Sequence, residues 1–197
     1  MPKTIDQDQR RAEVAAAVWR LIVDSGVSAV SLRTVAAEAG IVLGSLRHSF
    51  PTKADLLAYS MQLVHTTVER RVRDHAGIAD PLDMVTAMLL ELLPADDRRR
   101  TEMRVNVALI AESPAHPRLA ELAERSQRAI ADLCGQLCAD LAATGHLHAT
   151  RDPETEAARL HAYIDGIALH ELVTPTDAAR IEAAVRAYLR DLAAPRS

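Results

Sequence analysis

Aromatic side chains make up only 3% of this chain, and no long apolar run occurs in its 197 residues. A helix that spans a bilayer needs about 20 consecutive apolar residues, so we expect no membrane partner. The N-terminus, MPKTIDQDQRR, carries no apolar segment and does not resemble a secretory signal peptide. The sequence therefore predicts a cytoplasmic protein.

Cysteine is equally scarce, since the chain has only Cys134 and Cys138. Two cysteines four residues apart in a helical pattern form no disulfide framework. We interpret them as buried structural residues. The alternative is a metal or redox sensor, with His161 and His170 available elsewhere in the chain. We predict no cofactor and no metal.

The sequence motifs of catalysis are missing as well. The chain contains no glycine-rich phosphate loop, no nucleophile elbow and no zinc-hydrolase helix. Because no catalytic pair can be assigned, we predict that the protein is not an enzyme.

Alanine is abundant, and leucine, arginine and glutamate, which also favour helices, accompany it. Apolar residues recur at helical spacing rather than in alternation. The pattern predicts an all-α protein of about nine helices, the first from about residue 8 with Asp6 and Asp8 as candidate caps. The expected helices are 8–25, 32–39, 43–49, 52–75, 81–93, 98–113, 118–144, 153–172 and one from about 177.

Charge is distributed unevenly along the chain. The whole protein has a net charge of −4, but residues 1–53 hold seven Lys/Arg against five Asp/Glu, a net of +2. The remainder holds sixteen against twenty-two, a net of −6. This distribution is compatible with a small DNA-facing end on an acidic body.

Two short helices joined by a glycine-containing turn, at 32–39 and about 43–49, have the layout of a helix-turn-helix. Val35, Ala36 and Ala39 supply an apolar inner face for the first helix. Leu46 and Phe50, four residues apart, would anchor the second helix inward. Gly44 and Ser45 supply the small residues needed where this helix would approach the bases in a DNA groove.

The run VSLRTVAAEAGIVLGSLRHSFPTKADLL, residues 30–57, resembles the DNA-binding signature of the TetR family. The match covers about fifty residues, and the later layout, including the segment Ile-Asp-Gly-Ile at 164–167, is also similar to that family. The tripeptide Leu-Arg-His at 46–48 is most similar to the branch that includes the betaine-pathway repressor. The resemblance implies an N-terminal three-helix DNA-binding domain, residues 1–53, and a C-terminal helical ligand-binding and dimerisation domain, residues 54–197.

Roles at the DNA follow from this resemblance, position by position. Two of the usual residues are replaced, because Val42 stands where the family has a Ser or Thr cap and Ser49 where it has histidine. Leu43 offers only an apolar contact, such as one with a thymine methyl group. Phosphate contacts are expected from Ser31, Arg33, Arg47 and Lys53, base-edge contacts from Leu43, Gly44 and Ser45, and a contact of either kind from His48.

The resemblance also implies a homodimer and a small-molecule effector that binds between the middle helices. Expected interface residues are Ile164, Gly166, Ile167, Ile181, Val185 and Tyr188, which could equally pack inside one subunit. Expected effector-lining residues are Met84, Met88, Met103, Asn106, Val107, Ile110, Cys134 and Tyr163; core packing, and a protein partner for Asn106, are the alternatives.

The hypothesis is therefore a ligand-responsive repressor that binds a palindromic double-stranded operator as a homodimer and is released by its effector. An activator or a ligand-free regulator is the closest alternative. A helical enzyme or small-molecule binding protein that carries a helix-turn-helix is a rival of another class.

Overall fold

The computed structural model describes the backbone of residues 2–193 and the side chains of residues 9–193. In this range the chain forms nine α-helices and two short 3-10 helices, without a strand, so the all-α prediction is confirmed. No helix in the described part of the chain has the length and apolar character needed to cross a membrane.

The chain folds into two compact units. The first comprises the residues up to 66 together with 104–124, and the second comprises 67–103 with the residues from 125 onward. Three helices, α4 (Lys53–Asp74), α6 (Asp97–Ala111) and α7 (Pro117–Ala143), contribute residues to both units. The two units reflect how compactly the chain packs, not what each part does. The division into a DNA-binding domain, residues 1–53, and a ligand-binding and dimerisation domain, residues 54–197, stays a prediction.

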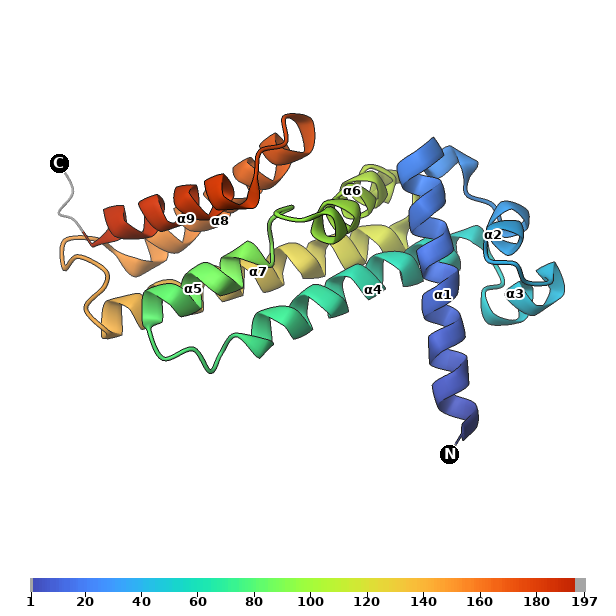
Figure 1. The fold of residues 1–197 in the computed structure, drawn as a ribbon, viewed down its shortest axis with the longest axis horizontal. Coiled ribbons are helices and arrows are strands. Elements are labelled where there is room, and N and C mark those ends of the chain that lie inside the picture. Colours follow the sequence, from blue (N-terminus) through green and yellow to red (C-terminus); the bar gives the residue numbers. More distant parts are fainter. Residues whose placement is uncertain (1, 194–197) are drawn as a thin grey trace. The chain divides into compact units, whose positions relative to one another are not determined.

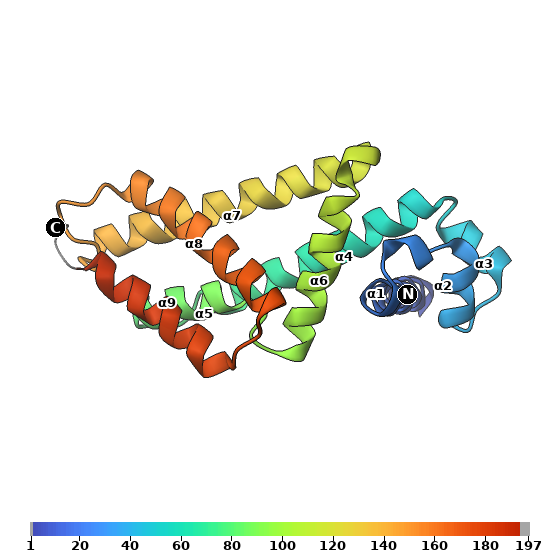
Figure 2. The ribbon, with the colours of Figure 1, turned by 90° about the horizontal axis from the view of Figure 1, so that it is seen from above.

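The first unit begins with α1 (Pro2–Ser25), followed by the 3-10 helix η1 (Val27–Ala29). Figures 1 and 2 show the short helices α2 (Leu32–Glu38) and α3 (Leu43–Ser49) beside α1. The 3-10 helix η2 (Ser113–Ala115) precedes α7. Valines and leucines on α1, α2, α3 and the start of α4 are buried, so each of these helices turns apolar side chains inward.

The second unit contains α5 (Pro81–Leu90), α8 (Pro153–Val173) and α9 (Ala178–Leu192), with most of α7. Figures 1 and 2 show α8 and α9 as an antiparallel pair. Asp80, Asp152 and Asp177 cap the three helices by accepting backbone N–H bonds. The proline that follows Asp80 and Asp152 has no N–H to lose at this position.

The predicted helices agree with the observed ones, with shifts at their ends. The first helix begins at Pro2, so Asp6 and Asp8 lie inside it, and their prediction as caps is wrong. The fifth ends at Leu90 rather than at residue 93, because a tight turn with i to i−3 bonds follows it. Helix ends are set by such local bonds, which apolar spacing does not encode.

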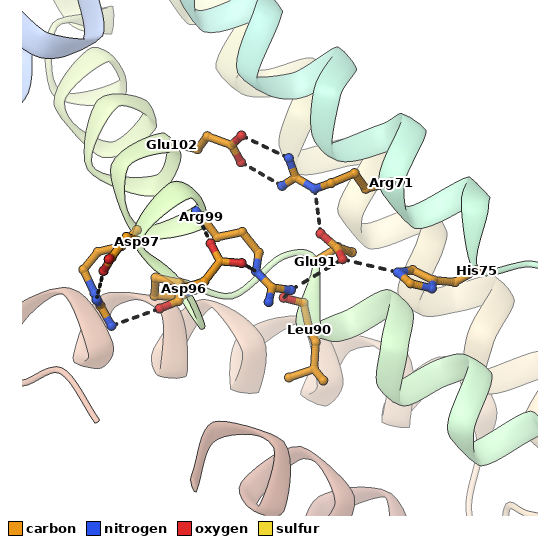
Figure 3. A network of polar contacts seen from close by, with 10 residues as sticks. Arg71, His75, Leu90, Glu91, Asp96, Asp97, Arg99 and Glu102 are labelled. Carbon is orange, nitrogen blue, oxygen red and sulfur yellow. Dashed lines mark hydrogen bonds and ion pairs between the residues drawn. The ribbon is translucent and has the colours of Figure 1, made fainter. Parts of the chain in front are cut away.

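A buried charged network joins α4, the end of α5 and α6 in the second unit (Figure 3). The guanidinium of Arg71 donates two bonds to the carboxylate of Glu102, at 3.0 and 2.7 Å, and a third to Glu91 at 2.6 Å. His75 contacts the same Glu91 at 3.3 Å, and Arg99 lies 3.5 Å from it. The side chains of Arg71 and Glu102 are only 10% and 5% exposed, so water contributes little to their solvation.

The pKa of Glu91 reflects this arrangement. Burial alone would raise it, but hydrogen bonds from Arg71 and His75 and the charges of Arg99 and Arg71 outweigh burial. The net shift of the Glu91 pKa is downward, so the carboxylate stays ionised at neutral pH. A guanidinium held by two carboxylates fixes the relative positions of α4, α5 and α6 at this point.

Replacing Arg71 by methionine should destabilise the protein by about 3 kcal/mol, because Glu102 and Glu91 would be left as buried charges without their main partner. Chemical unfolding followed by circular dichroism measures the effect. Arg73→Met on the exposed side of the same helix is the matched control and should change stability by less than about 0.5 kcal/mol. Equal losses in the two variants would contradict this account of the network.

Candidate nucleic-acid interface

The turn between α2 and α3 is built by specific local bonds. Ser31 caps α2, since its hydroxyl accepts the N–H of Thr34 at 3.1 Å while the Thr34 hydroxyl accepts the N–H of Ser31. At the other end Gly40 has φ +66°, a backbone conformation that side chains disfavour. The N–H of Ile41 then returns to the carbonyl of Ala36 at 2.9 Å. This closes α2 and turns the chain into α3.

Helix α3 is anchored by two large apolar side chains. Leu46 and Phe50 are each only 1% exposed. The Phe50 ring lies 5.2 Å from the ring of Tyr59 on α4, and the guanidinium of Arg11 lies 5.0 Å and 4.6 Å from these two rings. A cation over aromatic faces adds electrostatic attraction to the apolar packing. One face of α3 is therefore held inward.

The opposite face of the motif is open to solvent. Arg33 on α2 and Gly44, Ser45, Arg47 and His48 on α3 are all exposed. A Cβ built on Gly44 would meet no atom within 4 Å, so the backbone is approachable there. Ser31 and Leu43 are half-buried at the edge of the same face. The predicted DNA-contacting residues of the two short helices are thus exposed or half-buried, so their side chains are accessible to a ligand.

Lys53 differs from the others because its ammonium group is already engaged. It donates to the carbonyl of Val27 at 3.0 Å, and its side chain is half-buried. An ammonium has three donors, so this bond leaves donors for a further acceptor. The bond ties the start of α4 to η1.

Val42 precedes α3 and makes no side-chain cap bond. Its side chain is 77% exposed. The sequence identified the missing cap, but not this exposure, because spacing alone does not tell which way an N-cap residue points.

Five of the eight predicted effector-lining residues lie in the core of the second unit or pack against it. Met88 and Cys134 are buried there, and Met84, Met103 and Tyr163 pack against that core. The Tyr163 ring stacks on Tyr188 at 4.4 Å, and its hydroxyl donates to the carbonyl of Ala184 at 3.1 Å.

The other three, Asn106, Val107 and Ile110, belong to the first unit. Asn106 is half-buried, and its amide oxygen lies 2.9 Å from the His65 ring nitrogen. The protein itself therefore supplies a partner for Asn106, which was one of the alternatives weighed from the sequence.

The predicted interface residues fall into two groups. Ile164, Ile181 and Val185 are at most 2% exposed within the single chain, so they have almost no surface to offer a second subunit. Ile167 and Tyr188 are half-buried, and Gly166 is exposed. A partner that meets α8 and α9 could thus contact Gly166, Ile167 and Tyr188, but not the three buried residues.

Cys134 and Cys138 are both fully buried free thiols. Burial, with the neighbouring Cys138 and Asp165, raises the pKa of Cys134 to about 12. Burial, with Glu156 nearby, raises the pKa of Cys138 to about 11. Since the thiolate is the reactive and metal-binding form, this environment favours the structural interpretation of the pair. Among the described side chains, residues 9–193, no three of His, Cys, Asp or Glu come together as a ligand set.

Sequence reasoning missed the Arg71 network and the partner of Asn106. A signal for the first was present, because Glu102 shares helical spacing with the buried Val105 and Leu109. A carboxylate on an apolar face requires a buried cation. The sequence did not show which of its 23 Lys and Arg residues that cation would be.

Comparisons with known proteins agree with this geometry. Residues 14–59 match the model of the tetR family of bacterial regulatory proteins, and residues 81–194 match that of the C-terminal part of BetI-type transcriptional repressors. The chain therefore belongs to the TetR family of transcriptional regulators, which are DNA-binding proteins and not enzymes.

Three relatives illustrate the similarity. The transcriptional regulator PksA of Bacillus subtilis is 38% identical over 177 residues, 89% of this chain and 84% of its own. A transcriptional regulator of Rhodococcus sp. Rha1 superposes with a TM-score of 0.79 at 27% identity, covering 92% of this chain and 95% of its own. The multidrug binding protein EbrR in complex with ethidium gives a TM-score of 0.64 at 27% identity, covering 93% and 98%.

The environment of the two cysteines predicts their reactivity. At pH 8 both thiols should resist labelling by a thiol reagent in the native protein, because the attacking thiolate is scarce and both sulfurs are buried. After unfolding in guanidinium chloride both should react. Rapid labelling of one or both thiols in the folded protein would favour the sensor alternative instead.

Proposed function

We propose that this protein is a homodimeric transcriptional repressor that binds a palindromic DNA operator and is released by a small-molecule effector. The observation that carries the proposal is the exposed face of α2 and α3, held outward by the burial of Leu46 and Phe50. A helix of this kind fits the major groove, and two copies read two half-sites related by the dimer symmetry.

On this face, Arg33 and Arg47 are the proposed phosphate ligands, because exposed guanidinium groups offer charge and a fork of donors. Ser31 and Lys53 would add phosphate contacts at the edge, and His48 a phosphate or base contact. Leu43, Gly44 and Ser45 would lie against base edges. Phosphate contacts supply affinity and position, whereas base contacts supply sequence choice.

The proposed dimer forms through the solvent side of α8 and α9. Leu169 is 58% and Val173 78% exposed on α8, and small residues continue the surface at helical spacing. The exposed residues of this surface are Ala158, Ala162, Gly166, Leu169, Val173, Ala179, Ala183 and Ala187. Small side chains allow close approach of helices, and exposed large apolar ones gain most from being covered.

The proposed effector binds in the second unit, near Met84, Met88, Met103 and Tyr163. Methionine adapts to ligands of different shape, and EbrR, described as a multidrug binding protein, is a relative in complex with ethidium. An effector releases DNA only if it binds the DNA-free arrangement more tightly, and the two affinities must then shift by the same factor.

Selection from random double-stranded DNA should enrich a palindrome, because two identical heads in a symmetric dimer read inverted half-sites. When placed over a promoter in a reporter strain, that sequence should lower transcription in the presence of the protein. Failure to enrich any palindrome would contradict the proposal. Increased transcription would favour the activator alternative.

Arg47→Ala and Lys53→Ala should each weaken binding to specific and unrelated DNA alike. Each phosphate contact contributes about 0.9 to the slope of log K against log salt, so a symmetric dimer should lose about 1.8. Titration of binding at several salt concentrations measures the slope. Arg70→Ala, an exposed arginine in the second unit, should leave it unchanged; equal slopes in all variants would contradict these roles.

A double substitution, Leu169→Glu with Val173→Glu, should convert a dimer into monomers, because four carboxylates would be buried without partners across the interface. Analytical ultracentrifugation at micromolar concentration measures the mass. Ala139→Glu, on an exposed position of α7, controls for added surface charge and should remain dimeric. A wild-type protein that sediments as a monomer, or a double variant that stays dimeric, would contradict the proposed interface.

A further inference from the structure

Val42 is an unusual residue for its position. It is the N-cap of α3, with φ −70° and ψ 132°, and its side chain caps nothing. Valine is among the poorest N-cap residues, whereas serine, threonine, asparagine and aspartate satisfy a backbone N–H. Val42 is also 77% exposed, and it is the one large apolar side chain in residues 9–59 that is strongly exposed. Neither helix capping nor core packing accounts for it.

The chemistry around Val42 is apolar as well. Between Ile41 and Leu46 the sequence is Ile-Val-Leu-Gly-Ser-Leu, without a charged side chain or a carboxamide. Gly44 leaves its surroundings open, and the first charged side chain of α3 is Arg47. The charged and carboxamide side chains that make the strong hydrogen bonds to base edges are therefore absent from the leading end of α3, where Ser45 carries the one side-chain hydroxyl.

In the major groove an apolar side chain can distinguish base pairs through one feature, the C5 methyl group of thymine. We propose that Val42 is a specificity-determining residue that covers a thymine methyl group in each half-site of the operator. The inference rests on the proposed function, and it uses the valine side chain rather than the backbone N–H groups of the short helix α3. Position 42 would then contribute to the choice of DNA sequence instead of capping α3.

The test removes single methyl groups from the DNA. Each thymine of the selected operator is exchanged for deoxyuridine, which removes only the C5 methyl group, and affinities are measured by fluorescence anisotropy. Covering one methyl group changes affinity about fourfold. Removing the methyl group from one half-site should therefore lower the affinity of the wild-type protein for the operator by about that factor. Removing it from both symmetric half-sites should weaken binding about fifteenfold. Deoxyuridine outside the half-sites is the control.

The matched variant is Val42→Ser, which deletes both methyl groups and restores a capping hydroxyl. Because serine is a better N-cap than valine, this variant should unfold at no lower temperature than the wild type. The affinity of Val42→Ser for the thymine operator should equal its affinity for the deoxyuridine operator. Val42→Thr, with one methyl group left, should show a smaller difference between the two operators than the wild type.

The outcomes separate this inference from the proposed function. Enrichment of no sequence in the selection contradicts the proposed function itself. A specific operator whose thymines can all be replaced by deoxyuridine without loss contradicts the role of Val42 alone. So does an operator half-site without thymine, or an equal loss in the wild type and Val42→Ser, since another group would then contact the methyl.

Discussion

The burial of Leu46 and Phe50 is the interaction on which the proposed interface depends. Helix α3 is only seven residues long, and a helix of that length is not stable alone. Two fully buried side chains four positions apart fix both its orientation and its rotation. Arg47 and His48 are exposed because their neighbours on the opposite face are held inward. The aromatic contact with Tyr59 and the cation of Arg11 extend this anchor to α4 and α1.

Helices α4 and α6 are tied to each other in both compact units. In the first unit the tie is the contact of His65 with Asn106, and in the second it is the ion pair of Arg71 with Glu102. Both helices continue from one unit into the other. In the proposed function, an effector that displaces α6 would therefore act on α4 through named polar contacts. Hydrogen bonds and ion pairs of this kind are among the contacts through which coupling between sites is carried.

Local sequence signals predicted most of the fold. The helix ends before Gly26, Gly40 and Pro51 and the helix start at Pro153 are encoded by single residues with strong backbone preferences, so the order and type of elements could be predicted. The first helix was predicted too short because Asp6 and Asp8 are good caps in isolation, and nothing local showed that the helix continues past them. Propensity ranks caps, but it does not decide which of several candidates begins the helix.

The predicted site residues depended on different kinds of information. For α2 and α3 the motif spacing also fixes the exposed face, so Arg33, Arg47 and His48 could be placed outward from sequence. For α8 and α9 the apolar stripe identified Ile164, Ile181 and Val185, which are buried within the chain. A stripe of large apolar residues marks the core first, whereas the proposed surface for a second subunit consists mostly of smaller, exposed residues. Apolar spacing cannot distinguish the core-facing side of a helix from its solvent-facing side when both sides are rich in alanine.

In the proposed function, the charged and the apolar side chains of α3 divide affinity from selectivity. Arg47 adds a full positive charge on a chain whose residues after 53 carry a net charge of −6. Phosphate attraction of this kind is independent of sequence and is weakened by salt. With no carboxamide or charge between Ile41 and Leu46, few side chains at the leading end can discriminate bases by hydrogen bonds. Contacts that are short-ranged, apolar and insensitive to salt would then carry a larger share of the choice of operator.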